Sequence, residues 1–148
     1  MSDGGAEHRR RLETLYAAAN IQRLFPSVLS LAAEGVSRIE AVIGPEHFHG
    51  AGAAHGAVYF KLLDDAAFFA ANTLVPDVFV LTASFTISLT APLGPGRVVA
   101  EGRWTSGRRR TLFADSVLYA SDGSEAGRGS GVFMRSRMSL RGLPGYGD

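Results

Sequence analysis

The chain has 148 residues, a net charge of +1, no cysteine and 46% hydrophobic residues. This length suits one domain, and the near-neutral charge gives no sign of a nucleic-acid partner. The lack of cysteine excludes disulfides, thiolate metal sites and a cysteine nucleophile. No apolar run reaches the roughly 18 residues that a membrane span needs. The first residues also lack the apolar stretch of a signal peptide, so we expect a cytoplasmic protein.

The spacing of apolar and turn-forming residues predicts two helices and six strands. In chain order we expect a helix over 7–24, strands over 28–34 and 36–43, a loop over 44–55, a helix over 56–74, and strands over 80–93, 97–105, 111–121 and 125–136. Pro26 ends the first helix, because proline disfavours helix in the residue before it. We predict a single domain over 1–148, with loose tails at 1–7 and 140–148.

The helix over 56–74 carries apolar residues on nearly every face, which is typical of a buried helix. The strand that follows alternates strictly, and we expect one of its faces to lie on the core. Its two faces are Ala83, Phe85, Ile87 and Leu89 on one side, and Thr82, Ser84, Thr86 and Ser88 on the other. A long central helix wrapped by a curved antiparallel sheet of about six strands buries both elements. We therefore predict an α+β fold of the hotdog architecture.

A short motif lies where the long helix begins. His49 is followed six positions later by His55-Gly56-Ala57, and Asp64 stands nine positions after His55. The hotdog-fold acyl-CoA thioesterases of the phenylacetate-degradation (PaaI-like) type have Asn or Gln, then His-Gly-Gly, then Asp or Glu at these spacings. The chain resembles this family in motif and in element order.

The resemblance covers roughly residues 25–136, and the segments "TASFTISLTAPL", "GRRRTLFADSVLY" and "GRGSGVFM" have counterparts in the family. The chain departs from the pattern at His49, at Ala57 in place of the second glycine, and at Phe68, where some relatives carry Ser or Thr. The resemblance implies a thioester hydrolase with acyl-CoA as its substrate and no cofactor. It also implies a homodimer, or a homotetramer built from two dimers.

Asp64 is the candidate base or nucleophile. A carboxylate in a buried helix is costly unless it is paired or used, and burial raises its pKa and makes it a better base. The alternative is a structural carboxylate that nearby N–H groups satisfy. The N–H of Gly56 is the candidate donor to the thioester oxygen, because the first N–H groups of a helix have no intrahelical partner. We interpret Asp65 as the ion-pair partner of Lys61, four residues earlier.

Three further residues are candidates for the catalytic site. His55 either caps the helix or contacts the substrate, and we expect it to donate a hydrogen bond. His49 either holds water or is an exposed loop histidine. Relatives place a Ser or Thr eighteen residues after the acid, where this chain has Thr82. Thr82 either holds the attacking water or lies on the outer face of the sheet.

The candidate substrate-binding residues fall into two groups. The first group lies on the long helix and would shape the acyl site, although core packing is the alternative for its aromatic members: Tyr59, Ala57 and Phe68. The second group would bind the phosphates of CoA, since guanidinium groups recognise phosphate well, and a solvated turn is the alternative: Arg109, Arg110 and Arg128.

Three histidines within nine residues, His47, His49 and His55, also raise the question of a metal site. No acidic residue at helical spacing completes such a ligand set, so we expect no metal. Along one helix, His55 and Asp64 are roughly 13 Å apart, which is too far for both to touch one thioester carbon. We therefore predict a two-fold dimer in which Asp64 of one chain faces loop 49–56 of the other.

Two other functions are compatible with the same fold. One is a hydratase or dehydratase, but the loop "HFHGAGAAHGA" lacks the prolines that usually shape such sites. The other is an acyl-CoA-binding or regulatory domain without turnover. Such a domain would be expected to lose the helix carboxylate, and Asp64 is present.

Overall fold

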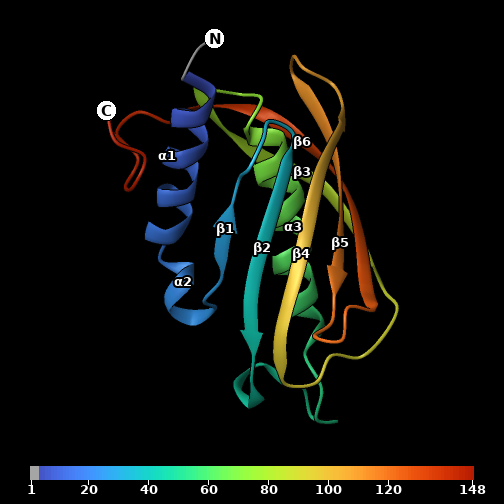
Figure 1. Cartoon of the computed structure of the whole chain (residues 1–148). Helices are drawn as coiled ribbons and strands as arrows, with labels where there is room; N and C mark the ends of the chain where they lie inside the picture. Colours follow the sequence, from blue (N-terminus) through green and yellow to red (C-terminus); the bar gives the residue numbers. More distant parts are fainter. Residues whose placement is uncertain (1–3) are drawn as a thin grey trace.

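A curved antiparallel sheet wraps around one long helix, α3, as Figure 1 shows. The structure is a computed structural model that describes residues 4–148. Its elements in chain order are α1 (Gly4–Ala18), α2 (Ile21–Leu24), β1 (Val28–Ser30), β2 (Val36–Ile43), the 3₁₀ helix η1 (Pro45–His47), α3 (Gly56–Asn72), β3 (Val78–Leu89), β4 (Gly96–Ser106), β5 (Thr111–Tyr119) and β6 (Glu125–Ser139). The strand order is β1-β2-β4-β5-β6-β3, so β1 and β3 form the edges. This arrangement confirms the predicted α+β fold.

The middle of α3 lies unusually close to the sheet. A Cβ atom at Gly102 of β4 would collide with the carbonyl oxygen of Ala66, so only glycine fits there. Two buried serines on β2 and β5, the strands on either side of β4, donate to helix carbonyls: Ser37 to Ala66, and Ser116 to Leu63 at 2.8 Å. These contacts fix how α3 is rotated, and they leave its opposite side free for the polar residues that follow.

The turn from α3 into β3 is held by Asn72, which is fully buried. Its amide nitrogen donates to the carbonyls of Val75 and Val78, and its side-chain oxygen accepts from the Val80 N–H at 2.9 Å. Because one side chain satisfies three backbone groups, the start of β3 has a fixed position relative to α3. The predicted helix end at 74 is therefore two residues too late.

The N-terminal helix predicted over 7–24 is two helices, because the chain bends between α1 and α2 at residues 19–20. Residues 1–3 of the predicted N-terminal tail lie outside the described residues, and residues 4–7 belong to α1. The prediction of a loose tail over 140–148 is wrong. Tyr146 is 7% exposed, and its hydroxyl lies 2.8 Å from Nδ1 of the buried His8. The ring of Tyr146 thus holds this glycine-rich segment against α1.

Candidate active site

Helix α3 begins at Gly56 because His55 caps it. His55 has an extended backbone, with φ −64° and ψ 149°, and its Nδ1 accepts a hydrogen bond from the Ala57 N–H at 2.9 Å. A side chain that accepts from one of the first helical N–H groups is what an N-cap requires. His55 therefore caps the helix, the first of its two predicted roles, and at Nδ1 it accepts a hydrogen bond instead of donating one.

A hollow of about 300 Å³ lies beside this helix start, lined by His49, Ala53, Ala54, Gly56, Tyr59, Leu89, Thr90, Ala91 and Pro92. The Gly56 N–H makes no hydrogen bond within residues 4–148. It lies at the positive end of the helix dipole, where an approaching oxygen that gains negative charge is stabilised. The hollow can therefore receive a polarised carbonyl oxygen.

The rim and wall of this hollow come from two predicted site residues. His49 is exposed, and its Nδ1 accepts from the Ala51 N–H at 3.0 Å, which shapes the loop. Tyr59 is 3% exposed, and its hydroxyl donates to the Ala91 carbonyl at 2.6 Å. Tyr59 thus ties α3 to the segment after β3, and its ring backs the hollow.

Asp64 lies in the middle of α3, half-buried, on the side that faces β3. Its Oδ1 accepts a hydrogen bond from the Thr82 hydroxyl at 3.0 Å. The pKa of the Asp64 carboxyl is raised to about 6: burial is the main cause, the hydrogen bond from Thr82 lowers the pKa, and the neighbouring Asp65 raises it. A carboxylate with this pKa is ionised at neutral pH and is a stronger base than an ordinary aspartate.

Thr82 faces α3 because β3 contains a bulge. Thr82 pairs with Phe133 of β6, whereas Ser84 pairs with Val132, so Ala83 is the extra residue. A bulge places two residues opposite one and breaks the alternation of faces. The prediction that Thr82 shares a face with Ser84 is therefore wrong, and so is the alternative that placed Thr82 on the outer face.

Asp65 points to the opposite side of the helix, towards α1. Its Oδ2 lies 2.9 Å from Lys61 Nζ and accepts from the Tyr16 hydroxyl at 2.8 Å. The predicted ion pair with Lys61 is confirmed. Because Asp65 has two strong partners and Asp64 has a single hydroxyl, Asp64 is the carboxylate that is available for chemistry.

Phe68, one turn after Asp64, is 8% exposed and packs in the core. Its ring centroid lies 4.9 Å from those of Phe69 and Phe79 and 5.8 Å from that of Phe133. These contacts are those of the core-packing alternative, and a role for Phe68 at the acyl site stays a prediction.

Phe60, one turn before Asp64, is an aromatic residue that the sequence analysis missed. It is 41% exposed and makes an edge-to-face contact with Phe85, with 5.6 Å between ring centroids. The signal was present in the sequence, because Phe60 and Asp64 are four residues apart and share one face of the helix.

The predicted CoA-binding arginines do not gather at the hollow beside Gly56. The backbone carbonyls of Arg109 and Arg110 accept from Arg135, which pairs with Val80 near the start of β3. Leu89, at the end of β3, is the residue beside Gly56. These positions are about 30 Å apart along the strand. Arg128 forms a two-pronged ion pair with Glu125 at 2.6 and 2.8 Å.

Gly56 and Asp64 are also apart within one chain. Eight residues of α3 separate them, which corresponds to about 12 Å along the helix axis. A single thioester group cannot span this distance. The carboxylate and the N–H donor of one chain therefore cannot contact the same thioester group.

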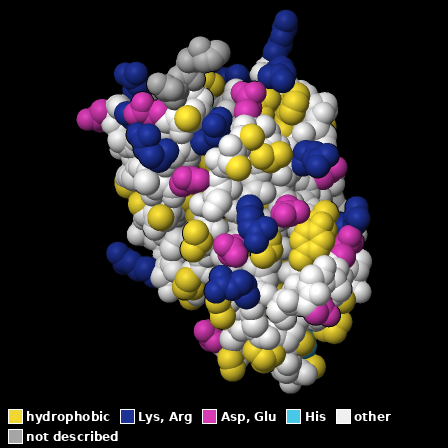
Figure 2. All heavy atoms as spheres, viewed as in Figure 1, with side chains coloured by type: hydrophobic (Ala, Val, Ile, Leu, Met, Phe, Trp, Pro, Cys, Tyr) yellow, Lys and Arg dark blue, Asp and Glu magenta, His cyan; other side chains and the backbone are white. Residues whose placement is uncertain are grey.

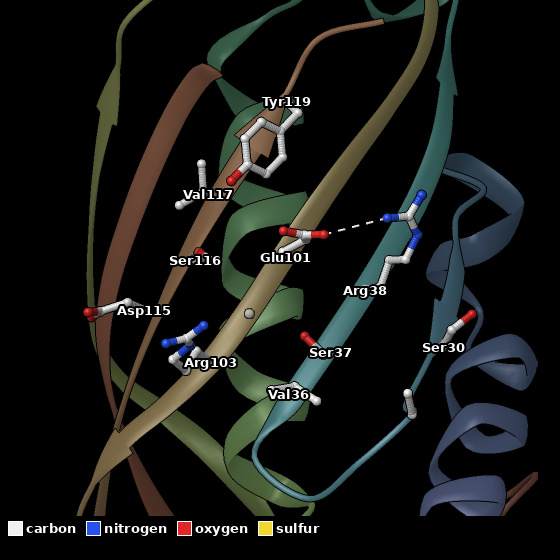
Figure 3. Close-up of a pocket in the computed structure, with 12 residues that line it drawn as sticks. Ser30, Val36, Ser37, Arg38, Glu101, Arg103, Asp115, Ser116, Val117 and Tyr119 are labelled. Atoms are coloured by element: carbon white, nitrogen blue, oxygen red, sulfur yellow. Dashed lines mark ion pairs between the residues drawn. The ribbon is translucent and has the colours of Figure 1, made fainter. Parts of the chain in front are cut away.

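A larger hollow, of about 490 Å³, lies over strands β2, β4 and β5 and is drawn in Figure 3. Its charged lining residues are Arg38, Glu101, Arg103 and Asp115, and Arg38 pairs with Glu101 at 3.5 Å. Figure 2 shows acidic, basic and hydrophobic side chains interleaved over the face seen in Figure 1. Asp64 and Gly56 do not line this hollow, so it is not the candidate site.

Two other classes of feature are missing from residues 4–148. No group of three or more His, Asp or Glu side chains is placed to hold a metal ion. No helix of this part of the chain combines the length and the hydropathy that crossing a bilayer requires.

Comparisons with known proteins agree with this geometry. The model of the thioesterase superfamily matches residues 51–126, which is just over half of the chain and includes Gly56 and Asp64. No curated protein matches.

Among solved structures, the PaaI protein of the E. coli phenylacetic acid degradation operon is 15% identical, with a TM-score of 0.82 over 91% of this chain and 97% of that chain. A thioesterase family protein from Silicibacter pomeroyi is 18% identical, with a TM-score of 0.79 over 86% and 96% of the two chains. A mutant of the phenylacetic acid degradation protein PaaI from Thermus thermophilus is 24% identical, with a TM-score of 0.71 over 80% and 100%. These likenesses show the fold.

Proposed function

Since the chain belongs to the thioesterase superfamily, we propose that it hydrolyses acyl-CoA thioesters to the free acid and CoA, with Asp64 as the general base or nucleophile. The observation that carries this proposal is the half-buried Asp64 carboxyl with a pKa raised to about 6. An acyl-CoA-binding protein without turnover would not need a carboxylate in this state, whose one side-chain hydrogen bond within residues 4–148 comes from Thr82 of β3.

Asp64 can act in two ways. As a base it removes a proton from water, which then attacks the thioester carbon; as a nucleophile it forms a mixed anhydride, which water opens. In both routes the thioester oxygen gains negative charge, and the Gly56 N–H donates to it. The sulfur of CoA then leaves with a proton. These steps need only water, so we expect no cofactor.

The separation of Asp64 from Gly56 is resolved if two chains share each site. β3 is an edge strand whose outer side is unpaired within residues 4–148. Leu81 and Leu89 on it are 46% and 53% exposed. An unpaired, apolar edge of this kind favours pairing with a second chain.

The register of such a pairing follows from two contacts. Thr82 marks the position of Asp64 along β3, and Leu89 marks that of Gly56. A two-fold axis between Phe85 and Thr86 places Thr82 of one chain opposite Leu89 of the other. Asp64 of each chain then lies beside the Gly56 N–H of the other chain. We propose this homodimer as the active unit; its pairing into a tetramer stays open.

The same arrangement gives the arginines a role. Arg110 lies two residues along β5 from Leu112, which shares a row of the sheet with Phe133 and Thr82. Two residues correspond to about 7 Å along a strand. This proximity supports the proposal that Arg109 and Arg110 bind the phosphates of a CoA whose thioester lies by Asp64. Arg128 would need to leave Glu125 to take part. The cytoplasmic location stays a prediction.

The test is a free-thiol assay against a panel of acyl-CoAs that vary in chain length and aromaticity, with Asp64→Asn as the control. We expect thiol release by the wild type and its loss in the variant. If acyl-CoA binds in calorimetry but no thiol appears for any member of the panel, the binding-domain alternative replaces the hydrolase. If a 2-enoyl-CoA takes up water while its thioester stays intact, the hydratase alternative replaces the hydrolase.

A further inference from the structure

The side chain of Lys61 is held by three oxygen acceptors on the side of α3 that faces α1. Its Nζ lies 2.9 Å from Asp65 Oδ2, 2.8 Å from the Tyr16 hydroxyl and 2.7 Å from the Ser27 hydroxyl. It also lies 5.3 Å from the centroid of the Phe25 ring. The side chains of Lys61 and Asp65 are only 12% and 21% exposed. A pair this enclosed is fixed in place, unlike an ordinary surface ion pair.

The spacing on the helix brings this pair close to Asp64. Lys61 precedes Asp64 by three residues and Asp65 by four, and residues at these spacings have Cβ atoms about 5–6 Å apart. Lys61 and Asp65 are thus within about one helical turn of Asp64, and charges that lie this near one another interact more where solvent is partly excluded. Asp64 and Asp65 are also adjacent, and the negative charge of Asp65 already acts on the pKa of Asp64.

Few charged groups other than Lys61 and Asp65 lie near Asp64 among the described residues. The inward-facing residues of β2, β3, β4, β5 and β6, which pack on α3, carry no titratable side chain near Asp64 among the described residues. On β3 the contact is the Thr82 hydroxyl. From α1 the nearest titratable group is Tyr16, whose pKa burial raises, so it stays neutral. Asp65 is therefore the charge that acts on Asp64, and Lys61 is the cation that pairs with Asp65.

We propose that Lys61 is a positioning residue for the reaction: through its ion pair with Asp65, anchored to α1 by Tyr16, it controls whether Asp64 is ionised. The proposal rests on the proposed role of Asp64 as base or nucleophile. Lys61 does not touch the substrate in this arrangement. Its positive charge offsets the negative charge of Asp65 and so weakens the repulsion that Asp65 exerts on ionised Asp64.

Replacing Asp65 and replacing Lys61 should shift the pKa of Asp64 in opposite directions. Asp65→Asn removes a negative charge and leaves Lys61 uncompensated, which favours ionised Asp64 and lowers its pKa. Lys61→Met leaves the charge of Asp65 unopposed and raises the pKa of Asp64. The double variant removes both charges and returns the pKa towards that of the wild type. We expect each single shift to be about 0.5–1 pH unit.

The experiment measures the protonation of the Asp64 carboxyl directly by NMR and indirectly through the rate of hydrolysis. The carboxyl ¹³C resonance, assigned by its loss in Asp64→Asn, is titrated in the wild type, both single variants, the double variant and Lys61→Arg. The pH dependence of kcat/KM is measured on the same proteins. Lys61→Arg keeps the charge and should restore the wild-type midpoint. Arg38→Met, which breaks the outer-face ion pair with Glu101, is the matched control and should shift nothing.

Opposite shifts for Lys61→Met and Asp65→Asn, with recovery in the double variant, support the proposal. Equal midpoints in all variants, or shifts of the same sign, overturn it. If Lys61→Met does not fold, Asp65→Asn and the double variant still decide the sign. If the carboxyl midpoint moves but the rate midpoint does not follow, the coupling holds and the assignment of Asp64 as the reacting group fails.

Discussion

Asp64 and Asp65 are neighbours in the chain, but they lie in two different environments. Asp64 faces β3, where the Thr82 hydroxyl is its hydrogen-bond partner. Asp65 faces α1, where Lys61 and Tyr16 both bind it. Both carboxylates are half-buried. The comparison teaches that two half-buried carboxylates can differ in the number and charge of their partners, and under the proposed function the one without a cationic partner is the one that reacts.

The difference between the two carboxylates is tested most directly by replacing each of them in turn. Asp64→Asn is nearly isosteric and keeps an acceptor for Thr82, so the fold and the affinity for CoA should remain. We expect kcat to fall by about 10²–10⁴-fold, the usual contribution of a positioned acid–base group. Asp65→Asn should lower kcat far less. Steady-state kinetics at pH 8, with circular dichroism as the folding control, measures both.

If Asp65→Asn is inactive while Asp64→Asn still hydrolyses the substrate, the roles of the two carboxylates are exchanged. Single-turnover hydrolysis in ¹⁸O-water then separates the two routes for whichever residue reacts. Only the anhydride route can leave label in the carboxylate, because there water can attack the carboxyl carbon of the enzyme; the general-base route leaves none.

The pH dependence of the wild type tests the raised pKa of Asp64. The ionised carboxylate is the reactive form, and its pKa lies at about 6. The rate should therefore rise about tenfold per pH unit below that value and level off above it, so that at pH 5 it is about one-tenth of the plateau. The measurement is kcat/KM between pH 4.5 and 8. A midpoint near 4, the ordinary value for aspartate, would contradict the environment described for Asp64.

The fold was predictable because its strongest signals are local. An all-round apolar helix from Gly56 and four strands separated by glycine turns define most of the architecture. The predicted tail over 140–148 failed because its order comes from distant contacts. Nothing in the spacing of the tail reveals that Tyr146 meets His8 across the molecule.

The surroundings of the candidate site were predictable only in part. Helical spacing alone was enough to pair Asp65 with Lys61. The orientation of Thr82 was not predictable, because the alternation of the strand is unbroken in the sequence and the bulge arises from pairing with β6. Tyr16 was also missed as a partner of Asp65, since forty-nine residues separate the two.

The contact between Asp65 and α1 is expected to contribute to the stability of the fold. Tyr16 is 4% exposed, and Tyr16→Phe removes the hydroxyl that contacts Asp65, Lys61 and Ser27. We expect a loss of about 1–2 kcal/mol in the free energy of unfolding, because buried polar partners lose a hydrogen bond. The plateau kcat should change less than about threefold. Tyr119→Phe, on the outer face, is the control and should cost little. A large drop in kcat with unchanged stability would place Tyr16 in the reaction.

The smallest effect on activity is expected for the contact between Asp64 and β3, and its test also tests the role of the bulge. The Thr82 hydroxyl stabilises ionised Asp64, so its hydrogen bond lowers the pKa of that carboxyl. Thr82→Val keeps the shape of the side chain and removes the donor, which should raise the midpoint of the pH–rate profile by about half a unit. Activity would then fall about threefold at pH 5.5. If Thr82 also holds the attacking water, the plateau at pH 8 falls as well. Ser84→Val is the matched control: strict alternation would put Ser84 on the same face as Thr82, whereas the bulge turns it outward. We expect Ser84→Val to leave the profile unchanged. If the two variants behave alike, the bulge does not set the site, and Asp64 has another partner.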